Sequence, residues 1–269
     1  MFEEQVARLE VQGEGVTGGT QRFTGALPAS PSTSLGELRV LYIPLTFADQ
    51  NTIPVSEAKC YEVMRDVSDF FYKASYGRLT AHATVSPPIK LPHNEAWYVQ
   101  KDSTEGFSKE FDALGLEHSH AREEARKLGY DSGDYDAVVV RLTGGPRSAG
   151  VGGWGGGTSV WMYNDSPGTV AHELGHCFGL MHANFWDTGG ASAIGPGSNL
   201  EYGDLFDVMG SHSSGGAFPL HFNAPQKAKL GYLDAAGVTT VTWNGVTNWN
   251  GGLGSAPCDI QFQLYASGI

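Results

Sequence analysis

The feature that most constrains the fold is a run of eleven residues, His172 to His182, which reads H-E-x-x-H-x-x-G-x-x-H. Histidines four positions apart share one face of a helix, so His172 and His176 can bind the same metal ion. Glu173 then lies beside them, and Gly179 can adopt the positive φ that lets the chain leave the helix sharply. That turn can bring His182 back as a third ligand. Three protein ligands and one open position are typical of a catalytic zinc site.

Length and composition indicate the number of domains and argue against nucleic-acid binding and against a membrane-spanning helix. The chain has 269 residues and a mass of 28.7 kDa, enough for one large domain or one domain with a small appendage. Its 17 basic and 29 acidic residues give a net charge of −12. An acidic surface repels phosphate, so we expect no nucleic-acid binding. No run approaches the roughly 18 apolar residues of a membrane-spanning helix.

The start of the chain and the cysteines bear on the cellular compartment. Residues 1–5 are acidic where a signal peptide is basic, and no apolar segment follows them. We therefore expect either a cytosolic protein or the mature or trimmed form of a longer one. Three cysteines are too few for a disulfide framework. Cys177 reads as a buried thiol, and a pair between Cys60 and Cys258 stays open.

Hydrophobic patterning predicts alternating strands and helices. The predicted strands are 38–47, 79–85, 136–142 and 158–163, and the predicted helices are 55–75 and 117–128. This alternation favours an α/β or α+β fold with a mixed sheet. The glycine-rich segment 144–157 lacks a phosphate-binding pattern and reads as a loop at the surface or at the edge of a cleft.

The composition of the two ends differs from that of the middle. Residues 1–36 are polar and rich in Gly, Ser, Thr and Pro, which predicts an extended arm or linker. Residues 37–235 form the predicted folded domain. Residues 236–269 carry Thr, Val, Trp, Asn and Gly and read as a β-rich tail.

A second element follows the histidine motif. The segment Asp207-Val208-Met209-Gly210 places Met209 27 positions beyond His182. In zinc proteases with a motif of this length, the pattern continues to a tight turn that contains methionine. We therefore predict that Met209 occupies such a Met-turn.

Three segments together resemble one family of proteins. HELGHCFGLMH at 172–182, YGDLFDVMG at 202–210 and HFNAPQKAKLGYL at 221–233 resemble the metzincin metallopeptidases, and most of all the gametolysin family. The resemblance spans about Leu38 to Leu233. It implies a metzincin-like catalytic domain at 37–235, with a twisted mixed sheet over two helices, the second being the zinc helix Val170 to Leu180. It also implies a secreted protein, Met209 as a hydrophobic floor below the zinc ligands, and a substrate cleft beside an edge strand, for which Thr158 to Tyr163 is the candidate.

The sequence departs from related metzincins in three places. Ala183 follows the third histidine where the snake-venom-like members carry aspartate. Ser211 stands two residues after Met209, where astacin-like members carry a tyrosine that reaches the metal. No cysteine lies in residues 1–36, so the matrixin type of cysteine-switch latency is not available from this arm.

The motif and the resemblance together predict a zinc-dependent endopeptidase that acts on protein or peptide. Zinc activates a water molecule, and Glu173 serves as the general base. The developing oxyanion needs a second donor, for which Tyr163, Tyr202 and His212 are candidates. A hydrolase with one narrow substrate is a second enzymatic interpretation.

A catalytically silent module that binds zinc, carbohydrate or protein is the alternative from another class. Trp243 and Trp249 of the tail would suit carbohydrate stacking. An intact Glu173 argues against this alternative, because zinc binding alone does not require it. Four acidic residues are also candidates for calcium, although they lack the spacing of a calcium loop: Asp187, Glu201, Asp204 and Asp207.

Overall fold

The computed structural model describes most of one compact unit, Leu27–Leu233. The described residues are 34–98, 107–142, 150–151, 158–190, 196–210 and 221–233, with the backbone alone for 107–114 and 150–151. The predicted arm lies almost wholly outside these residues, and the predicted tail lies wholly outside them. Both therefore stay predictions.

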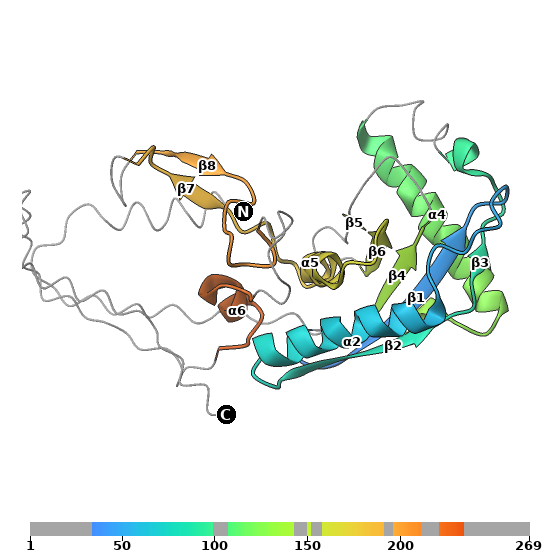
Figure 1. Cartoon of the computed structure of the whole chain (residues 1–269), viewed down its shortest axis with the longest axis horizontal. Coiled ribbons are helices and arrows are strands. Elements are labelled where there is room, and N and C mark those ends of the chain that lie inside the picture. The colour runs from blue at the N-terminus through green and yellow to red at the C-terminus, as the bar shows by residue number, and fades with distance from the viewer. Residues whose placement is uncertain are drawn as a thin grey trace, which may run out of the picture. The chain divides into compact units, whose positions relative to one another are not determined.

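A six-stranded sheet forms the centre of this unit, with the strand order β2-β1-β4-β6-β5 and with β3 paired to β1. The strands are β1 Gly36–Thr46, β2 Leu79–Val85, β3 Ile89–Lys90, β4 Ala137–Arg141, β5 Gly150–Val151 and β6 Ser159–Met162. β1 runs parallel to β2, β3 and β4, and β4 runs parallel to β6. β5 is antiparallel to β6. The predicted α/β class with a mixed sheet is confirmed (Figure 1).

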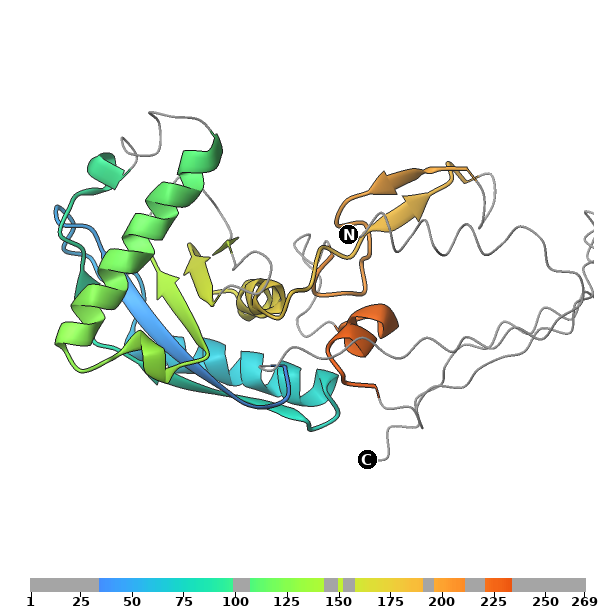
Figure 2. The same cartoon turned by 180° about the vertical axis from the view of Figure 1, so that it is seen from behind.

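Helices cover both faces of this sheet (Figures 1 and 2). The helices are α2 Glu57–Ala74, α4 Phe107–Lys127, the short 3-10 helix η1 Ser132–Asp134, α5 Pro167–Cys177 and α6 Ala224–Lys229. On one face, α2 and α5 share a core with Val40 and Tyr42 of β1. On the other face, α4 packs with Leu41 and Ile43. Because β1 is buried on both sides, its sequence is a continuous apolar run and not an alternating one.

The predicted edge strand is wrong. β6 lies between β4 and β5, so β5 is the outermost strand at this end of the sheet among the described residues. The strand β5 falls inside the glycine-rich segment 144–157, which the sequence analysis reads as a loop. Glycine disfavours strands because it has no side chain to pack, so composition concealed this short strand.

Helix α4 begins ten residues before the predicted start at Glu117. Gly115 lies within this added length, and glycine has a low helix propensity. A Cβ atom added at Gly115 would meet no other atom within 4 Å, so this position faces open space and glycine costs only its intrinsic propensity. Cys60 of α2 is a free thiol buried in the core, and burial raises its pKa to about 12. Cys258 lies outside the described residues.

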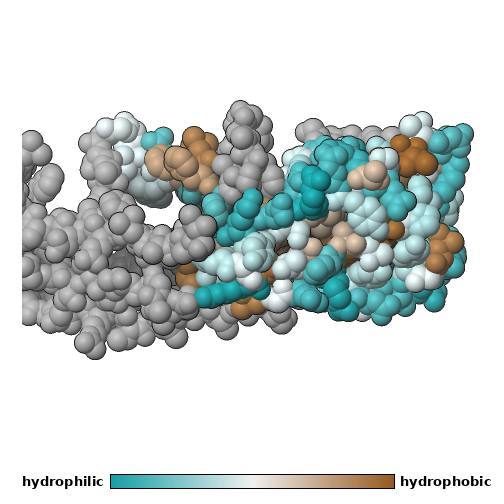
Figure 3. All heavy atoms as spheres, turned by 60° about the horizontal axis from the view of Figure 1, so that its bottom comes forward, coloured by the Kyte–Doolittle hydropathy of each residue, from teal (hydrophilic) through white to brown (hydrophobic). Residues whose placement is uncertain are grey.

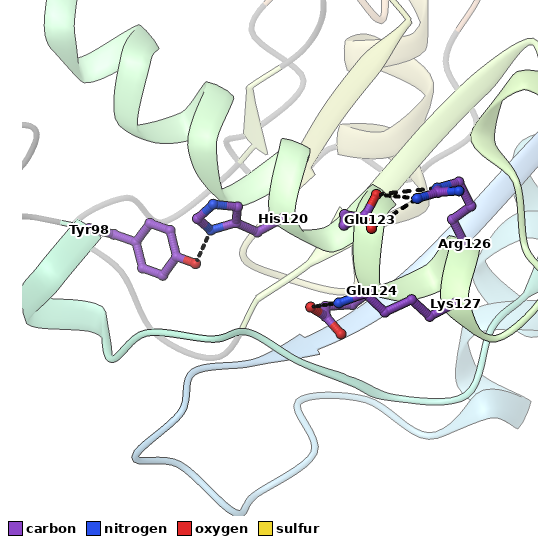
Figure 4. Close-up of polar contacts among 6 residues, drawn as sticks. All are labelled: Tyr98, His120, Glu123, Glu124, Arg126 and Lys127. Atoms are coloured by element: carbon purple, nitrogen blue, oxygen red, sulfur yellow. Dashed lines mark hydrogen bonds and ion pairs between the residues drawn. The ribbon is translucent and has the colours of Figure 1, made fainter.

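Polar contacts join α4 to its surroundings (Figure 4). The hydroxyl of Tyr98 lies 2.7 Å from Nδ1 of His120. Two exposed ion pairs, Glu123–Arg126 and Glu124–Lys127, lie along the helix, where water screens them and they add little stability.

The surface over α2 and β2 is mostly hydrophilic, with small, separate hydrophobic patches (Figure 3). No helix in the described part of the chain is both long and apolar enough to cross a membrane.

His118 anchors α4 to the sheet in its neutral form. Its Nε2 lies 3.2 Å from the carbonyl oxygen of Val138, and Arg122 Nε donates to its Nδ1 at 3.0 Å. The ring packs edge-on against Trp161, and the residue is 3% exposed. Burial, and then the charge of Arg122, lower the pKa of His118 from 6.5 to about 3.

This arrangement predicts an acid-dependent loss of stability. The folded pKa lies below the unfolded one, so the contribution of His118 is present above pH 6.5 and is lost as the pH falls toward 3. Between pH 7 and pH 5 the wild type should lose about 2 kcal/mol more of its free energy of unfolding than His118→Gln. Urea titrations at the two pH values measure this difference. Equal losses in both proteins would contradict a neutral buried His118.

Candidate metal centre

Helix α5 carries the first two histidines of the motif. It begins at Pro167, and the side chain of the N-cap Ser166 accepts a hydrogen bond from Thr169 N at 3.2 Å. The helix is nearly buried, and His172 and Glu173 are only 7% and 6% exposed. It therefore holds both side chains in a largely dehydrated part of the domain.

The helix ends three residues before the predicted end at Leu180, because the chain turns at Gly179. Gly179 has φ +80°, and its N–H donates to His176 O at 2.8 Å. Leu180 N–H donates to Gly175 O at 3.0 Å, which completes a Schellman motif. This sharp turn directs the next residues, including His182, back toward the helix.

The three histidines meet at one point. His172, His176 and His182 each offer a ligand atom, and these atoms all lie within 4.8 Å of one another. The ring centroids of the three pairs are 4.8, 5.0 and 5.5 Å apart. The spacing is suited to a single ion held by three imidazoles.

Each of the three rings is oriented through its Nδ1 atom, which lies at hydrogen-bond distance from an oxygen. The pairs are His172 with Val208 O at 2.8 Å, His176 with Leu180 O at 2.9 Å and His182 with Glu201 Oε1 at 2.7 Å. An acceptor at Nδ1 favours the tautomer that carries its proton there and leaves Nε2 for the metal. Burial also lowers the pKa of His176, which keeps it neutral. The donor set therefore fits Zn²⁺.

Met209 lies directly below the zinc helix. It is fully buried, and a Cβ atom added at Gly175 would come within 2.5 Å of its Sδ atom. The backbone around it is fixed by Ala183 N–H, which donates to Met209 O at 2.9 Å. The buried carboxylate of Asp207 accepts hydrogen bonds from Met209 N at 2.7 Å and Asn223 N at 2.6 Å. Burial raises the pKa of Asp207 to about 6, although both hydrogen bonds oppose the rise.

Of the three candidate oxyanion donors, the structure brings Tyr202 close to the histidines. The ring of Tyr202 lies 3.7 Å from that of His182 and 6.0 Å from that of His172, centroid to centroid. Burial, and then the charges of Glu201 and Glu173, raise the pKa of Tyr202. Tyr163 packs with the core on the α4 side of the sheet, away from the zinc helix. His212 lies outside the described residues.

The sequence analysis did not identify the structural roles of two residues of the centre, Gly175 and Glu201. Gly175 occupies a variable position of the motif, three residues after His172 and directly before His176, and only the absence of a side chain there hints that Met209 needs the space. Glu201 was considered as a calcium ligand, but its carboxylate is bonded to His182.

The other calcium candidates make separate contacts. Asp187 accepts a hydrogen bond from Gly189 N. Asp204 accepts hydrogen bonds from Phe206 N and from the Asn223 side chain. Asp207 accepts a hydrogen bond from Met209 N. Calcium binding stays a prediction.

Comparison with known proteins gives low similarities. No protein-family model and no curated protein match the sequence. Metalloproteinase-II from Bacteroides fragilis is 14% identical with a TM-score of 0.43, over 78% of this chain and 57% of that one. Archaemetzincin from Methanopyrus kandleri is 17% identical with a TM-score of 0.34, over 68% of this chain and 85% of that one. A chain from a chaperone-substrate complex is 16% identical with a TM-score of 0.35, over 62% of this chain and 28% of that one. The function therefore has to be inferred from the site itself.

The contact between Gly175 and Met209 yields a prediction. Gly175→Ala gains helix propensity but forces its Cβ onto Met209 Sδ, so it should lose about 1–3 kcal/mol of unfolding free energy. Gly115→Ala is the matched control: it adds the same methyl group to a helix where nothing lies within 4 Å, and should gain up to about 1 kcal/mol. Urea denaturation measures both. A stabilised Gly175→Ala protein would show that Met209 does not lie against the helix.

Proposed function

We propose that this chain is a zinc-dependent endopeptidase of the metzincin type that is similar to the gametolysin family. The observation that carries the proposal is the convergence of three imidazoles, each oriented through Nδ1, beside a buried glutamate on the same helix. A purely structural zinc site has four protein ligands, and among the described residues this group has three.

Glu173 is the proposed general base. When bound, zinc supplies a Lewis acid that activates water and polarises the scissile carbonyl. Glu173 follows His172 on α5 and is 6% exposed, and its charge acts on the phenol of Tyr202, whose ring lies against those of His172 and His182. It takes a proton from the attacking water and then delivers that proton to the leaving amine.

Tyr202 is the proposed second donor to the developing oxyanion. It stacks on His182 and has φ +60°, a conformation rare for residues other than glycine. Such backbone strain costs roughly 1–3 kcal/mol and is concentrated at functional sites. Its N–H is fixed by Asn184 Oδ1 at 3.1 Å. The phenol then donates a hydrogen bond where negative charge develops.

The outer edge of β5 is the proposed site for the substrate backbone. β5 contacts α5, which carries His172 and His176, and it is the outermost strand of this end of the described sheet. An extended peptide can add to such an edge by main-chain hydrogen bonds. A peptide bound at this edge would lie beside the helix that carries the first two histidines, and would be held by main-chain contacts alone.

The test is cleavage of a mixed peptide library. Wild-type protein should cleave it, and a zinc chelator should abolish cleavage. Glu173→Gln should keep its zinc but lose about 10²–10⁴-fold in turnover, because it lacks the general base. Glu62→Gln, an exposed carboxylate on α2, is the control and should leave turnover unchanged.

Metal content by mass spectrometry accompanies the kinetics. Normal turnover by zinc-loaded Glu173→Gln would contradict the mechanism. Zinc binding without cleavage by the wild type would favour the silent binding module.

A further inference from the structure

The exposed apolar side chains are concentrated next to the metal centre. Seven of the 13 exposed large hydrophobic residues in the described part of the chain lie between 181 and 206: Met181, Phe185, Trp186, Leu200, Tyr202, Leu205 and Phe206. Phe206 is 82% exposed. Large apolar side chains gathered in water mark a site of interaction.

Three of these residues, Phe185, Trp186 and Leu200, belong to a short β-hairpin. β7 (Phe185–Asp187) pairs antiparallel with β8 (Ser198–Leu200). Phe185 is directly opposite Leu200, so their side chains share one face, and Trp186 lies on the other face. Each is more than half exposed. The hairpin therefore has apolar side chains on both faces.

The hairpin lacks a third strand among the described residues. A two-stranded ribbon is marginally stable in water, and a further strand over an apolar face stabilises it. Its outer edges also offer backbone N–H and C=O groups that an extended peptide can bind. The missing strand indicates an extended polypeptide as the occupant.

The acidic residues near the hairpin indicate which kind of peptide it can bind. Residues 181–206 contain three acidic residues, Asp187, Glu201 and Asp204, and neither lysine nor arginine. The side chain of Glu201 is 65% exposed. A peptide with a basic residue is complementary to this surface, and an acidic peptide is repelled.

The hairpin is joined directly to the metal centre. Glu201 and Tyr202 follow β8 without a break, and both contact His182. A peptide bound along the hairpin thus lies beside the third histidine.

We propose that the β7–β8 hairpin binds a second segment of the substrate polypeptide, apart from the segment assigned to β5, as an added extended strand. It selects a segment that carries bulky apolar side chains and a lysine or arginine. This inference rests on the proposed function, because it takes the occupant to be the substrate.

Binding is measured apart from turnover, in the zinc-loaded full-length Glu173→Gln protein. The probe is a fluorescein-labelled extended peptide with Leu and Phe flanking an Arg, followed by fluorescence anisotropy. Phe185→Ser combined with Leu200→Ser should weaken binding about tenfold or more. Leu128→Ser is the matched control, since Leu128 directly follows α4 and is 56% exposed, and it should leave binding unchanged.

Changes in the probe test the same point without altering the protein. Replacing Arg by Glu, or Leu and Phe by Ser, should each weaken binding about tenfold or more. Zinc content and unfolding temperature of the variants show whether the hairpin substitutions leave the fold intact.

Three outcomes would overturn the proposal. The first is equal affinity of the hairpin variant and the Leu128→Ser control. The second is a dimer, seen by light scattering, that the hairpin substitutions dissociate, which would make a second copy of the chain the occupant. The third is binding of the chain to phospholipid vesicles that the same substitutions abolish.

The two proposals fail separately. A wild type that cleaves nothing, with selective binding intact, would reject the proposed function alone. Cleavage whose KM the hairpin substitutions do not change, together with unchanged binding, would reject the hairpin alone.

Discussion

The orientation of three imidazole rings is the interaction on which the rest of the structure depends. Each ring must present Nε2 to the same point, and a hydrogen bond at Nδ1 is what fixes it. The acceptors come from three places: the turn after α5, the end of the hairpin and the segment that contains Met209. Loss of any one of these segments would release a ring, so the centre requires everything between His172 and Met209 to fold around it.

Two close backbone approaches make that folding possible. Gly175 leaves space for Met209 below the helix, and Ala183 N–H is bonded to Met209 O. The chain between Ala183 and Met209 can therefore extend outward as the β7–β8 hairpin and still return to the same place. Asp207 fixes the point of return, since its buried carboxylate accepts hydrogen bonds from the backbone N–H groups of Met209 and Asn223. The exposed hairpin and the buried metal centre are therefore formed by one continuous segment of the chain.

Much of the fold could be predicted, because its elements carry strong local patterns. The strand at 79–85 was placed correctly, and β1, α2 and β4 were placed to within a few residues. β5 was missed because glycine hides a strand, and β7 and β8 were missed because three residues are too few to show a period. The three ligand positions follow from helical spacing and one glycine turn. The Nδ1 acceptor at Glu201 arises from tertiary contact 19 residues away from His182, which no local pattern encodes.

The most direct measurement of the central claim is X-ray absorption at the zinc edge on purified, full-length protein. The account predicts one zinc per chain with three imidazole nitrogens at about 2.0–2.1 Å and one further oxygen. A chain that binds no zinc would contradict it. So would a sulfur ligand at about 2.3 Å, which would mean that Cys177 or another thiolate, and not the three histidines, holds the metal.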